Sequence, residues 1–175
     1  QADMKAMSAL GAYAMSVITA LTAQSTRGVA GVHAVPVDFV RLQMDTLLED
    51  IVPDATKIGM LATAELADAV GEYLPGLTHT VLDPVMVATS GSRLIEQQAV
   101  DALVSNLMPL ADVITPNMPE AEVLCGFPVT NDEGMMQAAK LLCGKTNGAV
   151  LIKGGHRADT ADDLLLTEDI KDQDR

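Results

Sequence analysis

Short apolar segments alternate with amphipathic ones along most of the chain. Five of the apolar segments have the length and the β-branched residues of buried strands: Ser16–Leu21, Thr56–Met60, Thr80–Leu82, Val113–Thr115 and Ala149–Ile152. Between them, apolar residues recur every three or four positions, as on one face of a helix. In Pro36–Asp50, for example, Val40, Met44 and Leu47 share a face. Nearly all-apolar strands that alternate with helices predict an α/β fold, with the five strands parallel in one sheet and helices on both faces.

Cap residues predict where several helices begin. Asn117 with Glu120, and Thr130 with Glu133, have the spacing of a capping box, which predicts helices that start at those positions. Thr63 is a good cap for a third helix. The other predicted elements are helices over Gln1–Leu10 and Ile95–Met108 and candidate short strands at Val29–Val35 and Leu164–Leu166. No linker divides the chain, so we expect a single domain over residues 1–175.

The composition narrows the class of protein. Hydrophobic residues make up 49% of the 175 residues and aromatic residues only 2%, so the core must be aliphatic and rich in methionine. The net charge of -13 argues against a nucleic-acid partner, which would need a basic surface. No apolar run is long enough for a membrane span. Cys125 and Cys143 do not make a disulfide framework and fit free thiols in a reducing compartment.

Polar and flexible residues cluster just after the predicted strands. They are Gln24, Lys57 with Gly59, Asp83, Asn117 with Glu120, and the run Lys153-Gly154-Gly155-His156. Because the carboxyl ends of parallel strands meet at one edge of a sheet, where ligands bind in open α/β folds, these side chains should lie together. Carboxylates and an amide suit a hydrated Mg²⁺, and a lysine beside two glycines can reach an anion. The set suits phosphoryl transfer, which depends on positioning and on charge neutralisation.

Each of these residues also has a purely structural interpretation. Asn117 and Glu120 can serve only as a helix cap, and Asp83 can cap a turn. Lys57 can extend to solvent along its apolar stem, and Asp3 can be an ordinary surface residue of the first helix. On spacing alone, both interpretations stay open.

Well-known catalytic motifs are absent from the sequence. There is neither a P-loop nor a G-x-G-x-x-G motif, and no Cys or His pair has zinc spacing. His156 has no evident cysteine or serine partner and is more simply interpreted as a loop residue than as a catalytic base.

Seven short blocks stand in a recognisable order along the chain. They are Gln1-Ala2-Asp3-Met4-Lys5, Ser8 to Tyr13, Ser16 to Gln24, Thr56 to Leu61, Leu82 to Val87, Ile114 to Glu120 and Ile152 to His156. In this order they resemble the hydroxymethylpyrimidine/phosphomethylpyrimidine kinases, the thiamin-biosynthesis kinases of the ribokinase superfamily. The resemblance runs from Gln1 to about Leu166. Any one block is a weak match, but seven in order are specific.

The resemblance implies a ribokinase-like fold with three α/β/α layers and a mostly parallel central sheet. It also implies a kinase that uses ATP and Mg²⁺ to phosphorylate 4-amino-5-hydroxymethyl-2-methylpyrimidine and then its monophosphate. It implies a small-molecule substrate, a homodimer and a cytoplasmic location, with no nucleic-acid or membrane partner.

Four residues match the family's positions around the pyrimidine ring. Gln24 resembles the residue that reads the ring, which fits a carboxamide because it both donates and accepts hydrogen bonds. Asp3, Met60 and Val87 resemble pocket residues around the same ring.

Four other residues match the phosphate side of the family's site. Asp83 and Glu120 resemble residues on the magnesium side, and Asn117 and Glu120 resemble residues that face the nucleotide. Lys153 resembles the lysine that faces the nucleotide phosphates. The resemblance therefore implies that Lys153 and Asp83 take part in catalysis.

Parts of the family pattern have no counterpart in these residues. The family has a leading strand and a glycine-rich segment before the block at Gln1, and a Gly-Thr-Gly-Cys turn well after Lys153 that supplies an anion hole and the base. Cys125 and Cys143 do not match that cysteine. We therefore expect residues 1–175 to be a domain that is incomplete at both ends and, alone, to turn over slowly if at all.

Two other functions stay open. Pyridoxal kinase shares the fold and acts on a similar ring that carries a hydroxymethyl group, although the block from Lys57 to Leu61 and the Gln24 loop favour the pyrimidine. The second alternative is a truncated, non-catalytic chain that only binds a ligand or a partner.

Overall fold

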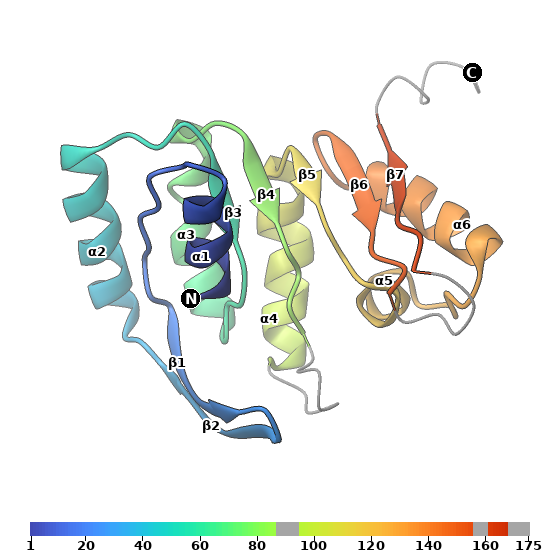
Figure 1. Cartoon of the computed structure of the whole chain (residues 1–175), viewed down its shortest axis with the longest axis horizontal. Helices are drawn as coiled ribbons and strands as arrows, with labels where there is room; N and C mark the ends of the chain where they lie inside the picture. Colours follow the sequence, from blue (N-terminus) through green and yellow to red (C-terminus); the bar gives the residue numbers. More distant parts are fainter. Residues whose placement is uncertain (87–94, 156–160, 168–175) are drawn as a thin grey trace.

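A five-stranded, mostly parallel sheet forms the centre of the molecule (Figure 1). The computed structural model describes residues 1–86, 95–155 and 161–167. The strand order is β3-β4-β5-β6-β7, with bounds Thr56–Ile58, Thr80–Leu82, Val113–Ile114, Ala149–Ile152 and Leu164–Leu166. The first four run parallel and β7 pairs antiparallel with β6. This confirms the predicted α/β fold, four of the five predicted strands, and the candidate strand at Leu164–Leu166.

The first predicted strand is wrong in both its position and its sheet. The strand β1 covers Ala20–Ser25 rather than Ser16–Leu21, and it pairs antiparallel with β2, Gly28–Ala34, in a separate two-stranded sheet. The apolar residues before β1 make other contacts. The backbone N–H of Ile18 donates to the Gln43 side chain (3.0 Å), whose amide donates back to the Ile18 carbonyl (3.1 Å). A side chain thus occupies the backbone groups that a neighbouring strand would otherwise pair.

Helices pack around the central sheet. They are α1 (Ala2–Ala9), α2 (Val37–Asp50), α3 (Ala64–Gly71), α4 (Gln97–Ala102), α5 (Met118–Cys125) and α6 (Asp132–Cys143). In Figure 1, α1 lies in front of β3 and α3 lies behind it, which gives the three layers that were expected. The predicted helix Ile95–Met108 is shorter as an α-helix, because α4 passes into a π-helical turn at Leu103–Leu107 and a 3-10 turn at Met108–Leu110.

The predicted helix caps are mostly confirmed. The Thr63 side chain accepts from the backbone N–H of Leu66 (3.3 Å) at the start of α3. Asn117 and Glu120 form both hydrogen bonds of a capping box at the start of α5. The capping box at Thr130 is wrong, because Asn131 is the N-cap of α6 and accepts from the Gly134 N–H at 2.9 Å. The carboxamide one position later satisfies the orphan donor instead.

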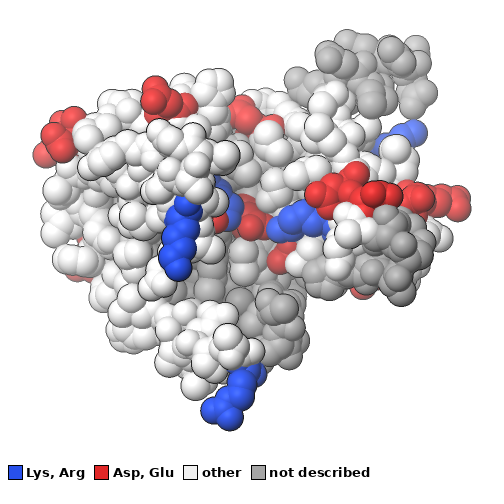
Figure 2. Space-filling view, viewed as in Figure 1, with Lys and Arg blue, Asp and Glu red and all other residues white. Residues whose placement is uncertain are grey.

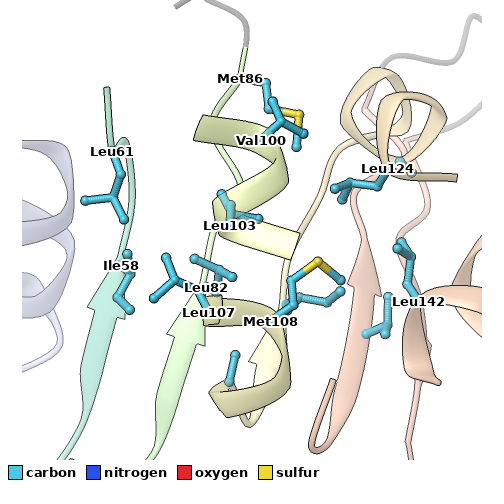
Figure 3. Packing of buried hydrophobic residues seen from close by; sticks show 14 of the residues in the cluster. Ile58, Leu61, Leu82, Met86, Val100, Leu103, Leu107, Met108, Leu124 and Leu142 are labelled. Atoms are coloured by element: carbon cyan, nitrogen blue, oxygen red, sulfur yellow. The ribbon is translucent and has the colours of Figure 1, made fainter. Parts of the chain in front are cut away.

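The core lies between the sheet and the helices behind it (Figure 3). Strand residues Leu82, Ile114 and Val150 are completely buried and belong to one cluster with Leu107 and Met108 from the segment after α4. Figure 3 shows Leu82 next to Leu107 in this cluster. Aliphatic chains and methionines fill this core, as the composition required. The packed strands form a rigid base for the residues that follow their carboxyl ends.

Candidate active site at the carboxyl edge of the sheet

The strand register places four polar residues side by side at one edge of the sheet. Lys57 lies on β3, Asp83 directly follows β4, Asn117 follows β5, and Lys153 directly follows β6. Backbone hydrogen bonds extend the ladders past the strand ends, from Asp83 N–H to Ile58 (2.8 Å) and from Lys153 N–H to Pro116 (2.9 Å). Asn117 and Lys153 also form an isolated parallel bridge. The expectation that these residues emerge together is confirmed.

Two lysines and two aspartates form a continuous chain of ion pairs across this edge. Lys153 Nζ lies 2.8 Å from Asp83 Oδ1, and Lys57 Nζ lies 3.4 Å from Asp83 Oδ2. Lys57 Nζ also lies 2.7 Å from Oδ1 of Asp3, which comes from α1. Figure 2 shows acidic and basic side chains next to each other near the centre of this face. We call Asp3, Lys57, Asp83 and Lys153 the charge chain.

The charge chain keeps its central members away from water. The Asp83 side chain is 16% exposed and that of Lys57 is 27% exposed, whereas Asp3 is 55% exposed. Burial by itself lowers the pKa of Lys57, but the hydrogen bond that Lys57 donates to Asp3 and the charge of Asp83 outweigh it, so the pKa of Lys57 is raised. Lys57 therefore carries its positive charge throughout the physiological range.

Glu120 is buried beside the charge chain. It is only 3% exposed, and its Oε2 accepts from the Asn117 N–H at 2.8 Å while the Asn117 side chain accepts from the Glu120 N–H at 2.9 Å. Burial, together with the charge of Asp83, raises the pKa of Glu120 more than the hydrogen bonds from Asn117 and Met86 and the charge of Lys153 lower it. The structural interpretation of this pair as a helix cap is therefore confirmed. A role toward a ligand stays a prediction.

The donor set at this edge fits Mg²⁺ better than a metal held by protein alone. Among the described residues, no three or more His, Cys, Asp or Glu side chains are grouped so that they could hold a metal ion. Magnesium ordinarily keeps several waters and takes only one or two carboxylates plus substrate phosphates. The carboxylates of Asp83 and Glu120, with the Asn117 amide, are of that kind and number. The ammonium of Lys153 lies beside Asp83, at 2.8 Å.

A close backbone crossing fixes the segment that carries Lys153. The N–H of Gly154 donates to Asp163 Oδ1 at 2.9 Å. A Cβ atom added at Gly154 would lie far inside van der Waals distance of the Asp162 carbonyl oxygen. Glycine is thus required here by space, and the turn after β6 is held against the segment before β7.

The remaining predicted site residues are placed less tightly. Gln24 lies on β1, is exposed, and accepts a long hydrogen bond from the Thr22 hydroxyl (3.4 Å). Figure 1 shows its hairpin projecting beyond the sheet on the side where β4 and β6 end. Met60 is half-buried, and its carbonyl accepts from the Thr19 hydroxyl at 2.9 Å. Val87 and His156 lie outside the described residues.

Sequence reasoning missed the contribution of two residues. The sequence pattern puts Lys57 at the edge of the sheet but indicates no role for it in the site, and it indicates no role for Asp163. For Lys57 the signal was present, since a charged residue inside a short apolar strand calls for a partner. Nothing in the spacing pointed to Asp163, because its contact with Gly154 depends on the path of the chain between β6 and β7.

Comparison with known proteins shows the family to which the chain belongs. The model of the family described as phosphomethylpyrimidine kinase matches residues 1–173. The hydroxymethylpyrimidine/phosphomethylpyrimidine kinase of Escherichia coli is 46% identical over 173 residues, which cover 97% of this chain and 65% of that protein. The chain thus spans less than two thirds of that relative's length.

Two solved structures have the same fold. The crystal structure of phosphomethylpyrimidine kinase from Clostridium difficile matches with a TM-score of 0.87 and 40% identity, covering 95% of this chain and 73% of that one. Pyridoxal kinase from Staphylococcus aureus in complex with AMP-PCP and pyridoxal matches with a TM-score of 0.83 and 32% identity, covering 95% and 61%. These likenesses confirm the ribokinase-like fold that the sequence resemblance implied.

Proposed function

The chain belongs to the phosphomethylpyrimidine kinase family, and from this premise we propose that its charge chain forms part of the active site of an ATP-dependent kinase. The substrate would be 4-amino-5-hydroxymethyl-2-methylpyrimidine and then its monophosphate, in thiamin biosynthesis. The observation that carries the proposal is the meeting of Asp83, Lys153 and the Asn117–Glu120 cap at one sheet edge. These residues follow three different strands and are far apart in the sequence, but they lie together in the structure.

On the substrate side, we assign ring recognition to Gln24, Asp3, Met60 and Val87. A carboxylate such as Asp3 accepts a hydrogen bond from the exocyclic amino group of an aminopyrimidine, and a carboxamide pairs with a donor and an acceptor on the ring edge. The Lys57 ammonium lies 2.7 Å from Asp3 Oδ1 and so helps to hold this carboxylate in place. The projecting hairpin brings Gln24 to the same side of the sheet.

On the phosphate side, Asp83, Glu120 and Asn117 are the residues that would hold hydrated Mg²⁺, and Lys153 would face the nucleotide phosphates. Bound Mg²⁺ supplies charge neutralisation for the phosphates. The ammonium of Lys153 is held at 2.8 Å by Asp83, so its direction is set before a nucleotide arrives. We therefore assign Lys153 and Asp83 to catalysis.

Pyridoxal kinase activity is the second candidate, because the chain shares 32% identity and its fold with a pyridoxal-bound kinase. The two functions differ in the ring that the pocket must read. A carboxylate at Asp3 suits the amino group of the pyrimidine, whereas pyridoxal offers a phenolic oxygen. This favours the pyrimidine as the better substrate.

A substrate comparison tests the assignment. The full-length protein is assayed with ATP and Mg²⁺ on hydroxymethylpyrimidine, its monophosphate and pyridoxal, with product formation followed by chromatography. We expect kcat/KM for hydroxymethylpyrimidine to exceed that for pyridoxal by about tenfold or more, as a mismatched polar contact in a site commonly costs. Higher kcat/KM on pyridoxal would select the second candidate, and turnover of neither would refute both.

Glu120→Gln separates the metal role from the capping role. Glutamine also completes a capping box, so the helix cap is retained while the negative charge is lost. We expect lower turnover and a higher Mg²⁺ concentration for half-maximal rate. A melting shift without a kinetic change would leave only the cap.

The stability of the same variant has a defined pH dependence. The pKa of Glu120 is raised on folding, so the wild type loses stability as the pH rises through that raised value. Glutamine does not titrate. We therefore expect the stability of Glu120→Gln relative to wild type, measured as the free energy of unfolding in urea, to be higher at about pH 7 than at about pH 4.

The homodimer and the cytoplasmic location stay predictions. Both Cys125 and Cys143 are free thiols, which is compatible with a reducing compartment. Of the described helices, none has the length and hydropathy that a membrane crossing requires.

A further inference from the structure

Lys57 joins the two halves of the proposed site. Its ammonium contacts Asp3 on α1 and Asp83 after β4, two carboxylates that come from different elements of the fold. Asp3 belongs to the half assigned to the pyrimidine ring, and Asp83 to the half assigned to magnesium and phosphate. Among the described residues, Lys57 is the cation that contacts both halves.

The geometry gives each oxygen of Asp83 its own lysine. Lys153 lies at Oδ1 and Lys57 at Oδ2, so the two ammonium groups together fix the rotation of this carboxylate. Removing Lys57 would free Oδ2, and Asp83 would then be able to turn fully toward Lys153. It would also leave Asp3 and Asp83 as neighbouring negative charges with no cation between them. Both changes would move groups that the proposed reaction needs in fixed places.

Stability alone does not account for this arrangement. The Asp3 side chain is more than half exposed, and ion pairs of that kind contribute about 0–1 kcal/mol to folding. Arg41 and Glu72 form such a pair on the surface, away from the sheet edge. The main effect of Lys57 is therefore on where its partners lie.

We propose that Lys57 is a positioning residue that sets the relative placement of Asp3 and Asp83, and so aligns the substrate's hydroxymethyl group with the phosphate side of the site. Lys57 acts through its two partners and contacts neither the transferred phosphoryl group nor the metal. This inference rests on the proposed function, because the two halves have meaning only if pyrimidine and nucleotide bind there.

The test is Lys57→Met in the full-length protein, since methionine keeps the apolar stem and removes the charge. We expect kcat/KM for hydroxymethylpyrimidine to fall about 100-fold, the loss typical of a misplacement of about 1 Å. The loss should be divided between a higher KM for the pyrimidine and a lower kcat. Lys57→Arg should recover part of it, because the charge and its reach are restored.

Two controls distinguish positioning from a simple loss of stability. Arg41→Met removes an exposed ion pair elsewhere and should change kcat/KM by less than about twofold. A double-mutant cycle with Asp3→Asn should show non-additive effects on the KM for the pyrimidine, since Lys57 acts on the ring through Asp3. Additive effects, or a lower Tm with wild-type kinetic constants in Lys57→Met, would overturn the inference.

Calorimetric binding of hydroxymethylpyrimidine supplies a readout that needs no turnover. Weaker binding to Lys57→Met than to wild type supports the inference, and equal binding contradicts it. If wild type works and Lys57→Met matches it in rate and affinity, the Lys57 inference fails and the proposed function survives. If wild type neither binds nor phosphorylates the pyrimidine, the proposed function fails and the inference fails with it.

Discussion

Lys153→Met is expected to lower the turnover of hydroxymethylpyrimidine by about 10²–10³-fold, the loss that follows removal of one preorganised electrostatic group from an active site. The backbone of Lys153 forms a β-bridge with Asn117 of the capping box, and Asp83 holds the Lys153 ammonium at 2.8 Å. Phosphoryl transfer spreads negative charge over oxygens that need such a neighbour. Methionine has a similar stem but no charge, so packing is largely kept. The measurement is steady-state kcat with saturating ATP and Mg²⁺.

A lysine at the other end of the same strand provides the matched control. Lys145 is exposed and precedes β6, whereas Lys153 follows it. Lys145→Met removes the same charge from the chain but not from the sheet's carboxyl edge, so kcat should stay close to wild type. Lys153→Arg should retain part of the activity, since it keeps the charge with a different shape. Equal losses for Lys145→Met and Lys153→Met would indicate a general charge effect and refute a local role.

The part of the site that follows from the sheet was predictable from the sequence. Asp83 and Lys153 come directly after an apolar strand and Asn117 comes three positions after one, and parallel strands place their carboxyl ends together. The same rule would hold for any parallel α/β sheet. Buried strands therefore carry positional information about the polar residues that follow them, even though each strand has only two to four residues.

Contacts between distant segments were not predictable in this way. Lys57 meets Asp3 across 54 positions, and this pair exists only because the tertiary fold brings α1 next to β3. Nothing in the pattern around Asp3 distinguishes that helix from a surface helix, since none of its residues is buried. Local periodicity describes each element, but the docking of one element on another is decided by tertiary packing.

The first strand fails for a different physical reason. Residues 16–21 are partly apolar and β-branched, as in a buried strand. However, the backbone of Ile18 bonds to the Gln43 side chain, and the Thr19 hydroxyl donates to the Met60 carbonyl. The strand begins later and pairs in a hairpin, with Leu21 57% exposed. Apolar content alone does not decide which sheet a segment joins.

Gly154→Ala is expected to destabilise the protein and slow the reaction together. The added Cβ would collide with the Asp162 carbonyl oxygen, a backbone atom that cannot move like a flexible side chain. Either the turn after β6 or the segment before β7 must shift, and strain of this kind typically costs about 1–3 kcal/mol. For a chain of this size, about 1 kcal/mol lowers the Tm by about 2–4 °C. Because Gly154 directly follows Lys153, the same shift displaces the Lys153 ammonium, to which we assign a role in catalysis.

The next residue offers the control for this prediction. A Cβ atom at Gly155 would meet nothing within 4 Å, so Gly155→Ala should leave both Tm and kcat near wild type. Calorimetric melting and steady-state kinetics on the two variants separate the effects. Equal melting temperatures for Gly154→Ala and Gly155→Ala would contradict the close contact between Gly154 and the Asp162 carbonyl. If Gly154→Ala were less stable but had wild-type kcat in its folded fraction, the crossing would support the fold without fixing Lys153. A joint loss requires that the hydrogen bond from Gly154 to Asp163 and the crossing beside it hold the lysine in place.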